Sequence, residues 1–91
     1  MVKKQDQTMD IKVRLHGVLQ HYRPKTLGGE VFALDVPEHA TVEEVGRQLG
    51  LPETWVCLTF VNGEACRKNQ QLRTGDLVAF LPPARGGTLE F

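Results

Sequence analysis

Large apolar residues occupy every second position in two separate stretches of the chain, from Ile11 to Leu15 and from Phe32 to Val36. A period of two is typical of a strand that buries one face, so the sequence predicts a strand over each stretch. The residues between them, 17–29, contain Pro24 and several glycines among polar neighbours. This composition predicts a loop or a wide hairpin connection.

The pattern becomes helical after residue 40. From Val42 to Leu49, apolar residues recur at the spacing of one helix face. Thr41 and Glu44 match a capping box at the start, and Gly50 suits the left-handed position that ends a helix. A helix of about ten residues is not stable alone, so we expect it to cover a sheet.

The second half of the chain predicts three further strands. A β-branched and aromatic run from Trp55 to Val61 ends at Asn62-Gly63, a strong turn signal. Residues 64–72 predict a weak edge strand and a loop, and residues 77–81 predict the last strand, which Pro82-Pro83 ends. This order of elements predicts an α+β domain. Its mixed sheet has four to five strands, with one main helix across one face.

The two ends of the chain fall outside this pattern. Residues 1–9 are polar without a period and predict a disordered N-terminal segment. Residues 84–91 have no period either and predict a flexible C-terminal tail. We therefore expect one domain over residues 10–83, as a length of 91 residues allows.

Charge and composition exclude several classes of protein. Eleven Lys and Arg balance eleven Asp and Glu, which argues against a nucleic-acid binder or a polybasic membrane-surface protein. No apolar run approaches the roughly 20 residues of a membrane span, and the N-terminus has no apolar signal stretch. Cys57, Cys66 and three histidines show no metal-ligand spacing. Two cysteines are too few for a disulfide-stapled domain, so we expect a cytoplasmic protein without a metal ion.

The last predicted strand has apolar residues on both faces, with Leu77, Ala79 and Leu81 on one and Val78 and Phe80 on the other. One set must pack beneath the helix, and the other is left exposed unless a partner covers it. We predict that Phe80, next to the tail, helps to dock a partner. The alternative is that Phe80 belongs to the core and Ala79 is the exposed residue.

Residues 72–87 closely resemble the C-terminal signature of ubiquitin-like sulfur carriers. A Gly75-Asp76 turn leads into the last strand, the prolines follow it, and Gly86-Gly87 closes the motif. The stretches 40–44 and 61–64 resemble the same family, so the likeness covers about residues 10–87. The run before the glycines looks more like the small subunit of molybdopterin synthase than like the thiamine-pathway carrier. The resemblance implies a β-grasp fold.

The resemblance also implies a chemistry for the tail. In this family an E1-like adenylating enzyme uses ATP to activate the terminal glycine carboxylate, here Gly87, and sulfur then displaces AMP to leave a thiocarboxylate. A sulfur-accepting synthase subunit is the next partner. The protein is then a carrier or co-substrate with no bound cofactor, because the catalytic groups belong to the partners.

The residues before Gly87 suit a tail that must present its terminal carboxylate inside the active site of a partner. Pro82 and Pro83 restrict φ and favour an extended exit from the sheet. Gly86 and Gly87 lack Cβ and can enter a channel too narrow for other residues. We expect Arg85 to contact the activating enzyme or a processing peptidase.

Residues 88–91 depart from the family pattern, because they place the Gly87 carbonyl in an amide bond to Thr88. A peptidase can remove these four residues, they can be a remnant of cloning, or the protein has lost carrier chemistry. We favour removal by a peptidase.

Two other functions stay open on sequence alone. One is a ubiquitin-like modifier that is joined to target lysines through Gly87. The other is a non-covalent β-grasp interaction module, for which the tail is dispensable. The sequence leaves the receiving pathway undecided.

Overall fold

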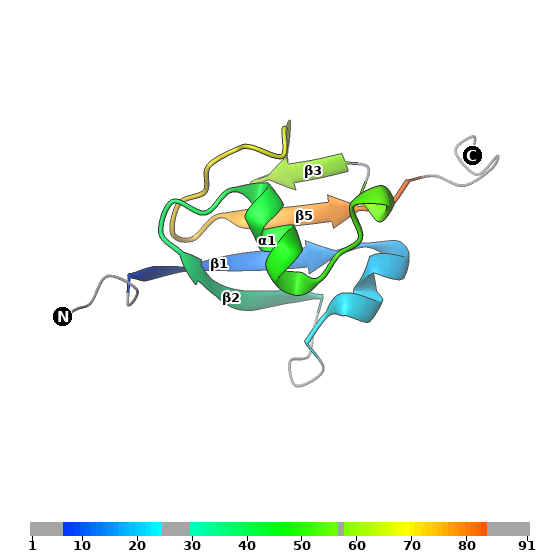
Figure 1. The fold of residues 1–91 in the computed structure, drawn as a ribbon, viewed down its shortest axis with the longest axis horizontal. Helices are drawn as coiled ribbons and strands as arrows, with labels where there is room; N and C mark the ends of the chain where they lie inside the picture. The colour runs from blue at the N-terminus through cyan, green and yellow to red at the C-terminus, as the bar shows by residue number, and fades with distance from the viewer. Residues whose placement is uncertain (1–6, 25–29, 57, 84–91) are drawn as a thin grey trace.

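The computed structural model describes residues 7–24, 30–56 and 58–83. They form one five-stranded sheet with a helix lying across one face (Figure 1). The elements in chain order are β1 (Thr8–Leu15), the 3-10 helix η2 (Gly17–Tyr22), β2 (Val31–Pro37), α1 (Val42–Leu49), the 3-10 helix η3 (Glu53–Trp55), β3 (Leu58–Val61), β4 (Glu64–Cys66) and β5 (Leu77–Leu81). The predicted α+β class, with one main helix over the sheet, is confirmed.

The sheet is mixed, with the strand order β2-β1-β5-β3-β4. The first and last strands of the chain pair in parallel at its centre, with Val13 opposite Val78 and Leu15 opposite Phe80. The pairs β1–β2, β5–β3 and β3–β4 are antiparallel. The chain therefore leaves the sheet from a central strand, and not from an edge.

One face of the sheet packs against α1 and forms the core. Its buried apolar residues alternate along each strand, as a strand with one covered face requires. The most deeply buried side chains are Ile11, Val13, Leu19, Val36, Val42, Val45, Val78 and Phe80. Among the described residues, Thr59 is the one buried polar side chain, and its hydroxyl donates to the Cys66 carbonyl at 3.0 Å.

The helix begins and ends where the sequence predicts. Thr41 Oγ1 accepts from the Glu44 amide at 3.3 Å, and Glu44 Oε1 accepts from the Thr41 amide at 3.0 Å, so the capping box is present. Gly50 follows with φ 79°, a left-handed conformation that glycine adopts at little cost.

Three boundaries differ from the sequence predictions. The first strand begins at Thr8, and Met9 is buried opposite Val36, so a domain start at residue 10 is two residues too late. The predicted loop after β1 contains η2, which Leu19 anchors in the core. The third strand begins only at Leu58, because η3 takes up part of the predicted run. In the first two cases one fully or nearly fully buried apolar residue supplies most of the packing, too little to establish a period. The Cys57 position lies outside the described residues.

A polar clamp holds the start of β5 against the β3–β4 turn. The two carboxylate oxygens of Asp76 accept from Asn62 Nδ2 at 3.0 Å and from the Arg73 amide at 2.8 Å. Asn62 Oδ1 accepts in turn from the Leu77 amide at 3.0 Å. The predicted Gly-Asp turn is thus tied to the predicted Asn-Gly turn by side-chain hydrogen bonds.

We expect Asp76→Ala to lower the free energy of unfolding by about 1–2 kcal/mol, because it removes the hydrogen bonds that Asp76 accepts from Asn62 and Arg73. Urea denaturation measures this loss. The matched control is Glu64→Ala on the exposed edge strand, for which we expect a change within about 0.5 kcal/mol. An Asp76→Ala protein as stable as the control would contradict the role of the clamp.

Candidate functional site at the base of the C-terminal segment

The chain leaves the sheet beside the end of β1. The His16 amide donates to the Phe80 carbonyl at 3.1 Å, and Leu81 still pairs with Leu58 on the other side. Pro82 is half-buried and Pro83 is exposed. The predicted reactive residue Gly87, the predicted recognition residues Arg85 and Gly86, and the extension 88–91 lie outside the described residues.

Phe80 does not lie on the surface. Its side chain is 1% exposed and packs in the core beneath α1, so the prediction that it docks a partner is wrong. The physical reason is the register of the sheet, which pairs Phe80 with Leu15, a residue of the buried face of β1. The alternative interpretation, with Phe80 in the core, is the correct one.

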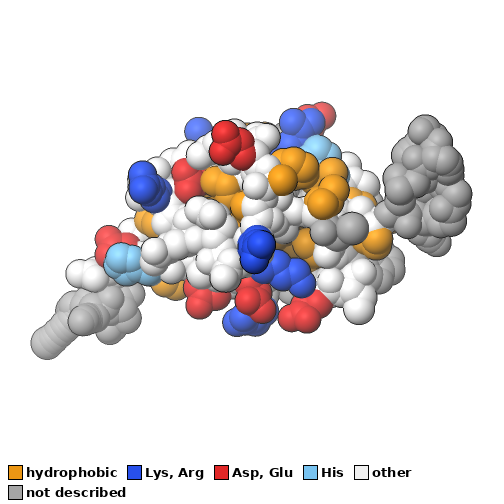
Figure 2. Space-filling view, turned by 90° about the horizontal axis from the view of Figure 1, so that it is seen from above, with side chains coloured by type: hydrophobic (Ala, Val, Ile, Leu, Met, Phe, Trp, Pro, Cys, Tyr) orange, Lys and Arg blue, Asp and Glu red, His pale blue; other side chains and the backbone are white. Residues whose placement is uncertain are grey.

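The opposite set of β5 residues faces away from the helix. Leu77, Ala79 and Leu81 are half-buried, and cross-strand pairing adds Phe60 next to Ala79 and Leu58 next to Leu81. We call these five residues the outer apolar face. Leu58 is 48% exposed. Seen from the β3 side, hydrophobic side chains gather on the half of the surface nearer the C-terminus (Figure 2).

Basic residues flank this face. Lys12 and Arg14 of β1 lie next to Leu77 and Ala79 in the parallel pairing. Arg14 Nη2 forms an ion pair with Glu30 Oε1 at 3.0 Å. The outer apolar face ends at Leu81, directly before Pro82, so it reaches the point at which the chain leaves the sheet.

A pair of carboxylates marks the far end of the same sheet face. Asp10 and Asp35 are opposite each other on β1 and β2. A hydrogen bond with Asp10 and the nearby negative charge raise the pKa of Asp35 above its ordinary value. The pair lies at the start of β1, whereas Pro82 follows the end of the parallel β5. It is therefore separate from the base of the tail.

The described parts of the chain contain no group of three or more His, Cys, Asp or Glu side chains able to hold a metal ion. None of their helices is both long enough and apolar enough to span a membrane.

A sequence model of the ThiS family matches residues 18–87, most of the chain. This chain belongs to the ThiS family. The resemblance to ubiquitin-like sulfur carriers is thereby confirmed. The match ends at Gly87, so residues 88–91 lie outside the family pattern. No curated protein matches the chain.

Solved structures of similar proteins place this ThiS-family chain in the β-grasp fold. The HVO 2177 protein of Haloferax volcanii matches with a TM-score of 0.68 and 21% identity, over 96% of this chain and 94% of that one. Small archaeal modifier protein 1 of the same organism matches with a TM-score of 0.62 and 21% identity, over 84% of this chain and 99% of that one. One chain of the complex of subunits 1 and 2 of the Helicobacter pylori molybdopterin-converting factor also matches. Its TM-score is 0.53 and its identity 27%, over 87% of this chain and 100% of that one.

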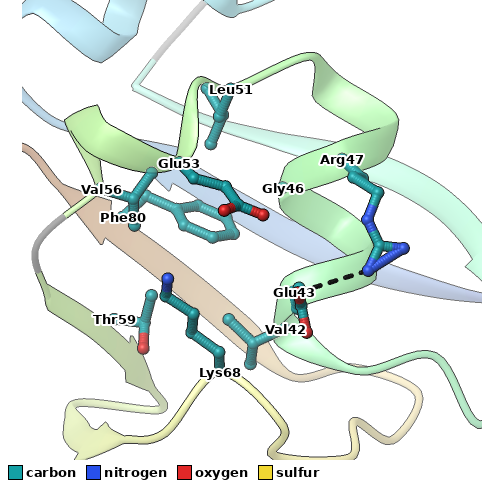
Figure 3. Close-up of a pocket in the computed structure, with 10 residues that line it drawn as sticks. All are labelled: Val42, Glu43, Gly46, Arg47, Leu51, Glu53, Val56, Thr59, Lys68 and Phe80. Carbon is teal, nitrogen blue, oxygen red and sulfur yellow. Dashed lines mark ion pairs between the residues drawn. The ribbon is translucent and has the colours of Figure 1, made fainter.

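On its helix side, this ThiS-family domain has a small recess of about 40 Å³ (Figure 3). Its apolar lining includes Val42, Leu51, Val56 and Phe80. Charged side chains surround the opening, among them Glu43 and Arg47, whose ion pair measures 3.4 Å between Oε2 and Nη2. Gly46 of the helix and the ring of Phe80 both line the recess, and a Cβ on residue 46 would point toward that ring.

We expect Gly46→Ala to raise the free energy of unfolding by about 0.5–1 kcal/mol, since alanine favours the helical state. The added Cβ would meet Phe80 Cε1 at 3.6 Å and Leu51 Cδ1 at 3.9 Å, ordinary contact distances. Thermal unfolding measures the gain. Gly50→Ala is the control and should lower stability, because φ is 79° there. A less stable Gly46→Ala protein would show that the recess is tighter than these distances indicate.

Proposed function

We propose that this protein is a sulfur carrier whose reactive group is the carboxylate of Gly87, exposed once the residues after it are removed. The carboxylate oxygen attacks the α-phosphorus of ATP in an E1-like adenylating enzyme, and pyrophosphate leaves. A sulfur nucleophile then attacks the acyl carbon, and the bond to AMP breaks to give a thiocarboxylate. The observation that carries the proposal is a ThiS-family match that ends at Gly87.

The surface around the tail supports this function. The outer apolar face lies on β3 and β5 and ends where the chain leaves the sheet. We propose it as the docking surface for the adenylating enzyme, with Pro82 and Pro83 leading the tail toward the active site. Apolar side chains that leave water at this surface would stabilise the complex through the hydrophobic effect.

The sulfur acceptor is proposed to be the large subunit of a synthase. The similar Helicobacter pylori chain comes from a complex of two molybdopterin-converting factor subunits. Together with the resemblance of residues 72–87 to the small synthase subunit, this favours an acceptor of the same kind. In that arrangement the protein is a co-substrate, and the partner subunit supplies the catalysis.

A ubiquitin-like modifier is the second candidate, because the same activated Gly87 can form an isopeptide bond to a lysine. The structural similarity to a protein named small archaeal modifier protein 1 supports this second candidate. Protein adducts in cells that disappear when Gly86 and Gly87 are deleted would favour the modifier over the carrier.

The decisive experiment uses a chain that ends at Gly87, incubated with its adenylating enzyme, ATP and a sulfur donor. We expect an intact mass in which one oxygen is replaced by sulfur. Omission of ATP is the control and should leave the mass unchanged. A control reaction with a carrier that the enzyme is known to adenylate shows that the enzyme is active. If this chain stays unmodified under the same conditions, the proposal is refuted.

A further inference from the structure

The end of β1 and the start of the tail meet at one glycine. β1 ends at Leu15, and Gly17 turns the chain into η2 with φ 58°. Leu19 is fully buried and anchors η2 in the core. Gly17 is therefore fixed in space by a buried side chain two residues later and by the hydrogen bond from the preceding residue, His16, to Phe80.

Gly17 lies directly against Pro82. A Cβ at residue 17 would lie 3.0 Å from Pro82 Cγ and 3.6 Å from Pro82 Cδ. Glycine is thus favoured at residue 17 by its positive φ. A side chain there would also press on the Pro82 ring, which would have to shift by a few tenths of an ångström. Gly50, Gly63 and Gly75 also have positive φ, but a Cβ there would meet nothing within 4 Å.

We infer that Gly17 is a positioning residue that sets the direction in which the chain leaves the sheet at Pro82, an inference that rests on the proposed carrier function. The ring of Pro82 is closed on its own backbone nitrogen, so a displacement of the ring displaces the main chain. Gly87 follows five residues later and must reach the reacting atoms of ATP in the partner. A misplacement of about 1 Å can reduce the rate of such a step by a factor of up to about 100.

The test compares Gly17→Ala with Gly50→Ala in chains that end at Gly87. Both substitutions impose the same kind of strain, at φ 58° and φ 79°, but only the first contacts the base of the tail. We expect Gly17→Ala to lower kcat for adenylation about tenfold, with KM unchanged because the outer apolar face is intact. Gly50→Ala should keep both constants. Equal losses in the two variants would overturn the inference.

A second variant separates the contact from the strain. Pro82→Ala removes Cγ and Cδ, the two atoms nearest to residue 17. Once they are gone, we expect Gly17→Ala to cause no further loss of kcat, so that the double variant matches Pro82→Ala alone. Additive losses would show that Gly17 acts independently of the tail.

A measurement without the partner enzyme makes the test independent of the proposed function. In partially aligned protein, residual dipolar couplings report the orientation of the Pro83 Cα–Hα bond, directly after Pro82, relative to the sheet. We expect a changed coupling in Gly17→Ala and in Pro82→Ala, and the wild-type value in Gly50→Ala. Unchanged couplings in all three variants would overturn the inference. A wild-type chain that is never adenylated would refute the proposed function, and the couplings would still decide the role of Gly17.

Discussion

The 91-residue chain is expected to gain no sulfur under conditions that convert the chain ending at Gly87 to the thiocarboxylate. Adenylation needs a carboxylate oxygen that can attack ATP, and in the longer chain the Gly87 carbonyl belongs to the amide bond with Thr88. An amide resists this reaction because its carbonyl oxygen carries no free negative charge. The expected contrast is all or none, and intact-mass measurement after incubation with adenylating enzyme, ATP and sulfur donor reads it directly.

Two matched chains make this result specific to the position of the carboxylate. A chain ending at Thr88 is one residue longer than the chain ending at Gly87 and differs from it in lacking a free Gly87 carboxylate. We expect it to stay unmodified. Proteolysis of the 91-residue chain at the Gly87–Thr88 bond should restore modification. If incubation of the 91-residue chain gives a shortened chain with sulfur at Gly87, the partner itself removes the extension. Sulfur at the terminal Phe91 would mean that Gly87 is not the reactive residue.

The helix was predictable almost to the residue because its signals are local. The capping pair Thr41 and Glu44, the apolar spacing and the left-handed Gly50 all lie within ten consecutive positions. The β1–β2 alternation was equally legible, since one face of that pair meets the core and the other meets solvent. Local chemistry thus specified the elements and the fold class.

The orientation of β5 could not be read from the sequence, because both of its faces are apolar. The parallel register with β1 decides it, and that register joins residues more than 60 positions apart. Gly17 was missed for a related reason. Its contact with Pro82 joins the two ends of the domain, and a single glycine in a polar stretch gives no local sign of that neighbour. Long-range pairing therefore determined the parts of the site that the sequence left open.

The same register predicts opposite consequences for two phenylalanines on neighbouring strands. Phe80→Ala should lower the free energy of unfolding by about 3–5 kcal/mol, because it removes a ring that is 1% exposed and leaves a cavity beneath α1. A loss of this size is a large share of the roughly 5–15 kcal/mol that stabilises a domain. Urea denaturation at low temperature measures it. A loss below about 1 kcal/mol, the range of a surface site, would contradict the core position of Phe80.

Phe60→Ala is the matched control, since Phe60 is half-buried on the outer apolar face opposite Ala79. Its stability loss should be clearly smaller, because the ring has solvent on one side and no cavity forms. Its effect should fall on binding, as a higher KM for the adenylating enzyme, with kcat retained. Phe80→Ala, measured where it is folded, should leave KM near the wild-type value. A raised KM in Phe80→Ala but not in Phe60→Ala would place the docking surface on the helix side of the sheet, beside the recess above Phe80.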